Sequence, residues 1–286
     1  ETEREPLVVV QTSDLHFNYV NEADFEEANP SIMATYNGRA WNKNGSSVPN
    51  AVRSLEFASQ GDAIVVTGDV LDYMSWGAIE LTDKYIWDTY PNAMVTLGNH
   101  EITRRCQDNP ATPDPTTLES RQEILQDNWD HDIFYESKVI DDRLMLIQLD
   151  NSNSCFWESQ VEPFEADLAL AREKGYDVFL FYHIPLATGN SKDTDIYPIM
   201  RRDGYNYDFY NNYIGNPKTS GASKTVYDII VNNGDIIKGT FCGHKHTWYY
   251  TEILAKTASG EATVIPQVVI AGTPYDGGHA LKIIVK

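Results

Sequence analysis

Short islands of Asp, Asn and His residues follow the apolar runs of this 286-residue chain, at the point where each run ends. The islands are Asp14-Leu15-His16, Gly68-Asp69, Gly98-Asn99-His100-Glu101, His183 and Gly243-His244-Lys245-His246. The runs are short and rich in β-branched residues, which favours buried strands that are covered on both faces. Because the carboxyl ends of parallel strands meet at one edge of a sheet, we expect the islands to converge there.

Helix-like stretches separate most of these apolar runs. We predict strands at 7–11, 63–67, 93–97, 144–149, 178–182, 236–242, 249–254, 263–271 and 280–285. We predict helices at 49–59, 77–89, 118–128, 161–174 and 224–232. Ser159 with Glu162 predicts a capping box for the fourth of these helices, and Gly175 predicts its end. The last three strands have no helix between them, so we expect them to complete a second sheet.

The islands extend from Asp14 to His246, so neither half of the chain contains the whole set. We therefore predict a single domain over residues 1–286. Two stretches, at about 17–47 and 186–223, break the alternation of strands and helices. Uninterrupted loops of this length in a compact domain are usually functional or disordered, and we interpret both as specificity insertions.

The second insertion follows His183 and is rich in aromatic residues. It contains Tyr197, Arg201, Arg202, Tyr205, Tyr207, Phe209, Tyr210 and Tyr213. Disordered segments have few aromatic residues, so this composition predicts a folded specificity lobe. The alternative is that these tyrosines only pack the insertion against the body of the protein.

The charge balance limits the partners of the chain, which has 42 acidic and 22 basic residues and a formal charge of -20. A surface of this sign repels long nucleic acid and anionic membranes. A small phosphorylated ligand stays compatible, because bound metal cations dominate the field inside their own cleft. No apolar run approaches the roughly 20 residues of a membrane span, so we expect no transmembrane segment. The oligomeric state is left open.

Composition, a sequon and the cysteines bear on the compartment of the protein and on the redox state of its thiols. The charged stretch from Glu1 to Glu5 before the first strand suggests a mature or trimmed product. The acidic, Tyr- and Asn-rich composition and the sequon Asn44-Gly45-Ser46 favour a secreted or cell-surface protein, with a cytoplasmic one as the alternative. Three cysteines without a CxxC spacing indicate neither a disulfide framework nor a zinc knuckle. Cys242 is expected to be a buried strand thiol, whereas Cys106 and Cys155 either pair or remain thiols.

The residue types of the islands indicate a metal centre. Asp, His and Asn supply the oxygen and nitrogen donors that suit manganese, iron or zinc, and cysteine is absent from the set. Gly68, Gly98 and Gly243 fit tight turns that let the backbone approach bound ions.

In this order, the islands resemble the calcineurin-like metallophosphoesterases, whose motifs run DxH, GD, GNH followed by Asp or Glu, a lone His, and GHxH. Every element is present in this chain, and the resemblance covers roughly residues 7 to 285. It implies a four-layer α/β/β/α sandwich, in which two mixed sheets pack face to face and are flanked by helices. It also implies a small phosphate-ester substrate and two divalent or trivalent transition-metal ions, namely Mn, Fe or Zn.

The resemblance implies two metal sites that share the carboxylate of Asp69. One site would use Asp14, His16, Asp69 and His246, and the other Asp69, Asn99, His183 and His244. A hydroxide that bridges the two ions would attack the phosphorus in line. His100 would stabilise or protonate the leaving oxygen, and Asp72 matches the carboxylate that orients this histidine in the family.

Departures from the subfamily patterns narrow the class. Tyr73 follows Asp72 where protein Ser/Thr phosphatases carry Arg-Gly, and Phe17 stands where they carry Gly. Purple acid phosphatases lack the first-motif histidine and place a tyrosine ligand where this chain has Asp72, so we expect no tyrosinate ligand. The strings Ser13-Asp14-Leu15-His16 and His183-Ile184-Pro185-Leu186 are more similar to secreted phosphoesterases of the sphingomyelinase-like and fungal-type branches.

Two other functions remain as alternatives. The first is a strict phosphodiesterase for cyclic nucleotides or sphingomyelin-like substrates, because monoester and diester hydrolysis share the two-metal core. The second is a non-catalytic metal-binding scaffold, a use of the fold that the family resemblance includes. Among residues near or outside the islands, Glu101 is expected to support its loop through hydrogen bonds. His131 and His279 are expected to be structural, and Asp24, Glu26 and Glu27 to form a solvated charged face.

Overall fold

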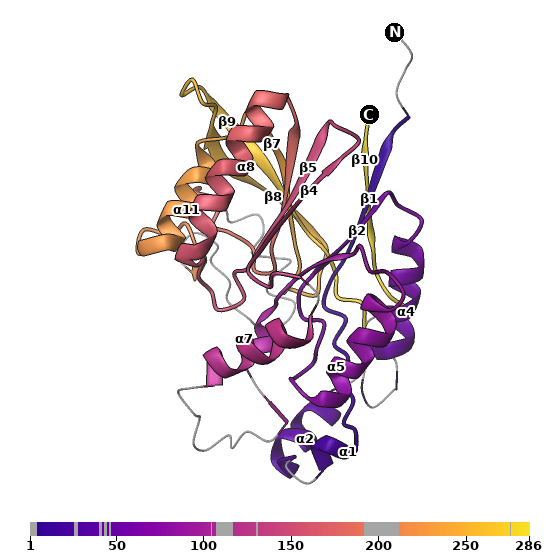
Figure 1. The fold of residues 1–286 in the computed structure, drawn as a ribbon. Coiled ribbons are helices and arrows are strands. Elements are labelled where there is room, and N and C mark those ends of the chain that lie inside the picture. Colours follow the sequence, from indigo (N-terminus) through magenta and orange to yellow (C-terminus); the bar gives the residue numbers. More distant parts are fainter. Residues whose placement is uncertain are drawn as a thin grey trace.

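Two mixed β-sheets and the helices outside them make up the computed structural model of the chain (Figure 1). It describes residues 5–25, 28–39, 42, 45, 47–103, 105–106, 117–129, 131–191, 212–274 and 276–286. The sheets have the strand orders β10-β1-β2-β3 and β4-β5-β6-β7-β9-β8. This architecture confirms the predicted pair of mixed sheets flanked by helices.

The first sheet consists of β1 (Leu7–Thr12), β2 (Ala63–Thr67), β3 (Met94–Thr96) and β10 (Leu281–Val285). β1, β2 and β3 are parallel, and β10 pairs antiparallel with β1. The expectation that the last strand belongs to the second sheet was therefore wrong. β10 instead covers the edge of β1 that β2 leaves open, so this edge is not exposed to other chains. In Figure 1, β10 lies beside β1 close to the C-terminus.

The second sheet consists of β4 (Tyr135–Ile140), β5 (Leu144–Leu149), β6 (Asp177–Phe181), β7 (Ile237–Cys242), β8 (Tyr249–Lys256) and β9 (Ala262–Val269). β5, β6, β7 and β9 are parallel neighbours, and the antiparallel strands β4 and β8 form the two edges. The sequence prediction missed β4. This strand has a half-buried, partly charged sequence, typical of an edge strand, and lacks the continuous apolar run that reveals the inner strands.

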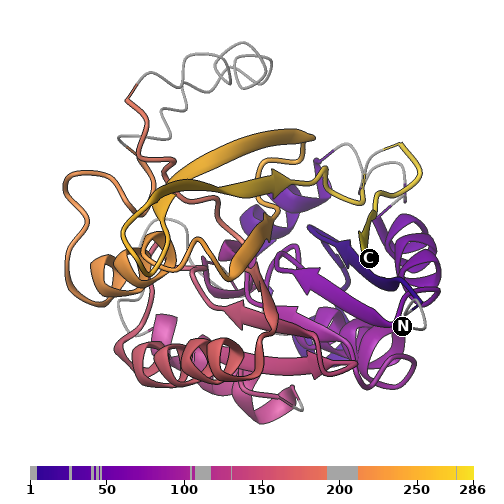
Figure 2. The same ribbon diagram turned by 90° about the horizontal axis from the view of Figure 1, so that it is seen from above.

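Helices cover the outer face of each sheet (Figures 1 and 2). The first sheet carries α4 (Ser47–Ala58), α5 (Trp76–Thr82) with the following π-helix (Asp83–Trp87), and α7 (Thr117–Asn128). The second sheet carries α8 (Val161–Lys174) and α11 (Gly221–Val231), preceded near α8 by a 3₁₀ turn (Glu158–Gln160). Shorter helices are α1 (Glu22–Phe25), α2 (Pro30–Asn37) and α6 (Asn99–Thr103). Within the described ranges, no helix is both long enough and apolar enough to cross a lipid bilayer.

The alternation of side chains along β5 explains the layered core. All six residues of this strand are buried. Leu144 and Leu146 belong to the cluster between the two sheets, together with Val9 and Val65 of the first sheet. Met145 and Ile147 point the other way and belong to the cluster that includes α8 and α11. A strand that is buried on both faces reads as a continuous apolar run, which is why β5 was predictable.

The ends of α8 show one confirmed and one wrong prediction. Gly175 ends the helix in the left-handed conformation, with φ of 74°, as predicted. The predicted capping box of Ser159 and Glu162 does not form. The side chain of Gln160 instead accepts a hydrogen bond from the backbone N–H of Trp157 at 2.7 Å, because a 3₁₀ turn precedes the helix.

The first of the two expected insertions, at 17–47, contains the short helices α1 and α2. In the second insertion, Tyr213 is buried, whereas the other tyrosines, Phe209 and both arginines lie outside the described residues. Asn44 and Ser46 of the sequon also lie outside them.

The three cysteines are thiols, so no disulfide joins Cys106 to Cys155. Cys242 is fully buried in β7, as expected.

Candidate metal centre

The carboxyl ends of five parallel strands bring the sequence islands together. Asp14 and His16 follow β1, Asp69 follows β2, and Asn99 begins α6 directly after β3. On the second sheet, His183 follows β6, and His244 and His246 follow β7. Five of these residues have the left-handed backbone conformation, namely Asp14, His16, Asp69, His244 and His246, with φ between 50° and 70°. Such conformations are uncommon outside glycine and cluster at functional sites.

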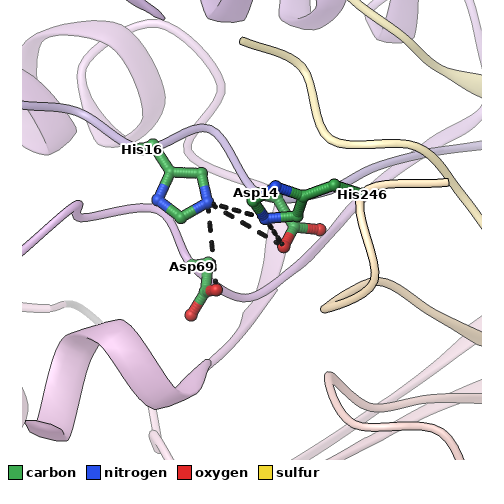
Figure 3. A group of neighbouring side chains, drawn as sticks. All are labelled: Asp14, His16, Asp69 and His246. Carbon is green, nitrogen blue, oxygen red and sulfur yellow. Dashed lines mark hydrogen bonds and ion pairs between the residues drawn. The ribbon is translucent and has the colours of Figure 1, made fainter. Parts of the chain in front are cut away.

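One donor group consists of Asp14, His16, Asp69 and His246, whose ligand atoms all lie within 4.8 Å of one another. Figure 3 shows the four side chains pointing toward one another. His246 Nε2 lies 2.9 Å from Asp14 Oδ1 and 3.0 Å from His16 Nε2. His16 Nε2 lies 3.9 Å from Asp69 Oδ2.

A second donor group contains Asp69, His183 and His244, again within 4.8 Å. His183 Nε2 lies 3.2 Å from Asp69 Oδ2 and 3.3 Å from Asn99 Oδ1. His244 Nδ1 lies 2.8 Å from the same Asn99 oxygen. The structure therefore brings together all seven residues that were predicted as metal ligands, and Asp69 belongs to both groups.

The hydrogen bonds behind the histidines test whether a cation fits here. His183 Nδ1 lies 2.7 Å from the carbonyl oxygen of Thr67, which only accepts, so Nδ1 carries the proton. In the neutral ring, Nε2 then presents a lone pair to the carboxylate of Asp69 at 3.2 Å. Two acceptors at this distance need a proton or a cation between them, and a fixed tautomer of this kind is typical of histidine ligands. The donor set fits a metal ion.

The electrostatics of the buried cluster agree with this fit. Burial alone would lower the pKa of His183, but the carboxylates of Asp69 and Asp14 raise it to about 9. Burial opposes ionisation of Asp14, yet His246 and His183 hold its pKa at about 2. The pKa of Asp69 is also held well below its usual value, chiefly by His183, against the effect of burial. These carboxylates are therefore anionic, which suits cation binding.

His16, Asp72 and His100 form a third group beside the first. Asp72 is fully buried, and its Oδ1 lies 3.1 Å from His16 Nδ1 and 3.5 Å from His100 Nδ1. His100 Nδ1 also lies 2.6 Å from the carbonyl oxygen of Asp72, so this nitrogen carries a proton. The predicted pair His100 and Asp72 is thus in contact, and Asp72 also contacts His16, which was not predicted.

The first insertion supplies further partners of Asp72 that sequence reasoning missed. Arg39 forms an ion pair with Asp72 Oδ1, and Asn18 and Asn42 donate to Oδ2 at 3.0 and 2.8 Å. Burial would raise the pKa of Asp72, but His16 and Arg39 lower it. Arg39 also lies over the ring of Tyr36, with its guanidinium carbon 4.5 Å from the ring centre. No motif or spacing marks these residues in the sequence.

Glu101 supports the turns of the first sheet, as predicted. Its carboxylate accepts hydrogen bonds from the backbone N–H groups of Asp69, Leu71 and Gly98. Burial and the charge of Asp69 raise its pKa to about 8, although these hydrogen bonds oppose the shift. Glu101 therefore fixes the loop that positions Asp69.

The expectations for His131 and Asp24, which lie outside the donor groups, have different outcomes. His131 is structural, with Nε2 2.8 Å from the carbonyl oxygen of Val95. The hydroxyl of buried Tyr73 donates to Asn18 Oδ1 at 2.9 Å. The prediction that Asp24 is solvated was wrong: its side chain is only 3% exposed, and it accepts hydrogen bonds from the first backbone N–H groups of α5. Glu26 and Glu27 lie outside the described residues.

A four-layer sandwich with His and Asp clusters at the carboxyl ends of its strands defines a class of metal-dependent phosphoester hydrolases. The chain belongs to the Calcineurin-like phosphoesterase family, whose profile matches residues 7–248. The family implies a dinuclear metal centre, and the two donor groups that share Asp69 provide a site for one. A comparison with curated proteins finds no match.

Several solved structures match the chain at low sequence identity. Purple acid phosphatase PPD1 from yellow lupin (Lupinus luteus) has a TM-score of 0.50 and 14% identity, over 95% of this chain and 45% of its own. A putative 5'-nucleotidase from Staphylococcus aureus has a TM-score of 0.41 and 14% identity, over 94% of this chain and 55% of its own. A dimetal phosphatase from Danio rerio has a TM-score of 0.45 and 11% identity, over 98% and 99%. The chain thus spans about half the length of the first two.

Proposed function

We propose that this protein hydrolyses phosphate esters at a dinuclear centre of Mn, Fe or Zn ions and that His100 acts as general acid. The sharing of Asp69 by two donor groups, each within 4.8 Å, is the observation that carries the proposal. A carboxylate that belongs to both donor groups can be shared by two cations, and nitrogen and oxygen donors suit these metals. Asp14, His16 and His246 would complete one site, and Asn99, His183 and His244 the other.

Two bound cations would supply an activated water and neutralise charge on the phosphate, which favours in-line displacement. The protein positions the donors through contacts behind them. Asp69 Oδ1 accepts a hydrogen bond from the backbone N–H of His100 at 2.9 Å, which leaves Oδ2 for the donor groups. Asp14 accepts hydrogen bonds from the backbone N–H of His244 at 3.1 and 3.2 Å. Contacts of this kind fix the ligand geometry before substrate binds.

His100 is suited to donate a proton from Nε2. Its Nδ1 is held by the Asp72 carbonyl at 2.6 Å, and the Asp72 carboxylate lies 3.5 Å away. Because Nδ1 donates to the backbone carbonyl, the proton that a doubly protonated ring can transfer is the one on Nε2, and the backbone contact fixes the orientation of the ring. The proton on Nε2 would move to the leaving oxygen as the bond to phosphorus breaks.

The test compares His100→Asn with Asp69→Asn. Metal content is measured by elemental analysis, and turnover with an alkyl phosphate and with 4-nitrophenyl phosphate. His100→Asn should keep both metals and lose about 10²- to 10⁴-fold in rate on the alkyl ester, but less on the nitrophenyl ester, whose leaving group needs no proton. Asp69→Asn should lose metal. Equal losses of rate on both esters would contradict the acid role, and unchanged metal content in Asp69→Asn would contradict the bridging role.

The same turnover assay can show whether the protein prefers phosphate monoesters or phosphate diesters. Turnover of 4-nitrophenyl phosphate against bis(4-nitrophenyl) phosphate separates a monoesterase from a strict phosphodiesterase. Metal binding without turnover of either substrate would favour the scaffold. Membership of the secreted branch stays a prediction from short strings of sequence, as does the position of the protein outside the cell.

A further inference from the structure

A cavity of about 660 Å³ adjoins the candidate metal centre. Its wall includes His244 and Lys245, which follow β7, and Ile184, which follows β6. The loop after β5 and the segment before α11 complete it. His244 belongs to both the second donor group and the cavity wall. The leaving part of an ester whose phosphate lies at the donor groups can therefore extend into this cavity, whose volume is typical of a small-molecule site.

The described residues of the cavity wall are basic or neutral, although the protein as a whole is strongly acidic. Lys245 and Lys218 both line the cavity, and none of the described residues in the wall is Asp or Glu. The whole chain has 42 acidic residues against 22 basic ones. A concave wall with one sign of charge concentrates ligands of the opposite sign. The charge of this cavity therefore favours an anion.

Lys245 is unusual because it is buried, with only 8% of its surface exposed. Its Nζ lies 5.3 Å from the centre of the Tyr213 ring, which places the side chain against the described end of the second insertion. Lys245 stands between His244 and His246 in the chain and also lines the cavity, so its side chain lies where the candidate metal centre and the cavity meet. A lysine at this position can contact an anion in the cavity.

The other side of the wall offers neutral donors. Thr219 and Ser220 line the cavity directly before α11. Ser220 is the N-cap of this 11-residue helix, yet its side chain makes no capping hydrogen bond, and the first turn contains no acidic residue. The N–H groups of an open first turn and its hydroxyls attract anions. The lysines and the N-terminus of α11 therefore both favour an anion in the cavity.

We propose that this cavity binds a second anionic group, a phosphate or a carboxylate, on the leaving part of the substrate. The proposal rests on the proposed function and names its substrate class: bisphosphates or phosphorylated carboxylic acids in preference to esters of neutral alcohols. Lysine binds phosphate and carboxylate as a point charge, so the two groups share the same recognition chemistry.

Three esters with the same three-carbon chain test the preference in the manganese-loaded enzyme. They are 3-hydroxypropyl phosphate, propane-1,3-diyl bisphosphate and 3-phosphonooxypropanoate. The leaving oxygen is a primary alkoxide in all three, so differences in kcat/KM report the distal group. We expect one or both anionic esters to exceed the neutral ester by at least about tenfold, after allowance for the two equivalent phosphates of the bisphosphate. Comparison of the bisphosphate with 3-phosphonooxypropanoate shows whether a distal phosphate or a distal carboxylate is preferred.

Substitution of each cavity lysine tests whether these residues cause the preference for anionic esters. Lys245→Met and, separately, Lys218→Met should each reduce the anionic-to-neutral ratio of kcat/KM by about threefold or more. Lys218 is exposed, so its variant tests the proposal even if Lys245→Met folds poorly. Lys224→Met is the matched control, because Lys224 lies in the first turn of the same helix, pairs with Asp228 and does not line the cavity. The control should keep the ratio of the wild type.

A labelling experiment separates failure of this inference from failure of the proposed function. Cys155 lines the cavity and is the partly exposed cysteine, whereas Cys106 and Cys242 are buried. Propane-1,3-bisphosphonate, which cannot be hydrolysed, should slow alkylation of Cys155 by iodoacetamide more than 3-hydroxypropylphosphonate does. Turnover of all three esters at equal efficiency, or equal labelling with both phosphonates, would overturn the inference. Lack of turnover of every ester with selective protection of Cys155 would instead contradict the proposed function.

Discussion

Gly98 packs against Asp69 so closely that a Cβ atom at position 98 would lie 2.2 Å from the backbone nitrogen of Asp69 and 2.3 Å from its Oδ1. Real Cβ atoms do not approach other atoms to such distances, so only glycine fits here. The glycine therefore lets the turn after β3 lie directly against the turn after β2. This contact brings Asn99 beside the donor group of Asp69, His183 and His244.

The first prediction is that Gly98→Ala displaces Asp69 and weakens metal binding. Overpacking of a buried site costs about 1 to 3 kcal/mol, and here the clash is with backbone and with a predicted ligand. We expect a lower thermal midpoint and fewer metal ions per chain by elemental analysis. Gly175→Ala is the control, because Gly175 has φ of 74° but nothing within 4 Å of an added Cβ. That variant should lose about 1 kcal/mol from backbone strain and keep its metals. Wild-type metal content in Gly98→Ala would contradict the prediction.

The second prediction concerns the ion pair between Arg39 and Asp72. Arg39→Ala leaves a buried carboxylate with fewer donors, so we expect a loss of about 1 to 3 kcal/mol in the free energy of unfolding. We also expect slower turnover of alkyl phosphates, because Asp72 contacts His100. Denaturant unfolding and steady-state kinetics check the two effects.

Arg172→Ala is a suitable control for Arg39→Ala. Arg172 pairs with Asp235 on the surface, where the two side chains are 39% and 28% exposed. Exposed ion pairs contribute only about 0 to 1 kcal/mol. Equal losses of stability in both variants, with unchanged turnover in Arg39→Ala, would show that the Arg39 pair is an ordinary surface contact.

The donor groups were predictable from sequence because their geometry follows from local rules. Each ligand comes directly after a parallel strand, and parallel strands of a sheet end at the same edge. Inner strands such as β5 are recognisable because both faces are buried. These two facts place His183 beside Asp69 although 114 positions separate them in the chain (183 minus 69).

The contacts of Asp72 with Arg39, Asn18 and Asn42 were not predictable in this way. Their stretch has no strand or helix periodicity that fixes which side chains point toward the site, and their partner is 30 or more positions away. β10 shows the same limit. Its apolar pattern predicts a strand, but the pattern does not say which sheet has an open edge for it.

The third prediction concerns Asp24, whose environment is the opposite of the expected one. Its carboxylate accepts hydrogen bonds from the backbone N–H groups of Trp76 and Gly77, both at 2.9 Å, at the start of α5. Asp24→Asn replaces one acceptor oxygen by a donor, so one N–H group loses its partner. We expect a loss of about 1 to 2 kcal/mol in the free energy of unfolding.

Glu22→Gln in the same short helix is the control for Asp24→Asn. Glu22 is exposed, and substitutions on the surface usually change stability by less than about 0.5 kcal/mol. Urea unfolding of the two variants and the wild type gives the comparison. A variant Asp24→Asn that unfolds at the same urea concentration as Glu22→Gln would show that Asp24 does not cap α5.

The fourth prediction is a pH dependence of stability that arises from Asp150, which follows β5. This residue is buried and accepts hydrogen bonds from the backbone N–H of Ser152 at 2.8 Å and from Trp157 Nε1 at 2.6 Å. Burial raises its pKa from 3.8 to about 6, and the two hydrogen bonds only partly oppose the shift. Between pH 3.8 and about pH 6, Asp150 therefore keeps its proton in the folded protein, whereas the same residue has released it in the unfolded chain.

Stability must then fall as the pH rises from about 4 to about 6 and stay level above that range, as far as Asp150 is concerned. Other groups titrate in the same range, so the useful quantity is the difference between the wild type and Asp150→Asn, which has no titratable group at this position. At about 1.4 kcal/mol per pH unit, the wild type should lose on the order of 3 kcal/mol relative to the variant. Urea unfolding of both metal-free proteins between pH 4 and pH 7 measures this difference. A constant difference over the whole range would mean that Asp150 ionises in the folded protein as easily as in the unfolded chain.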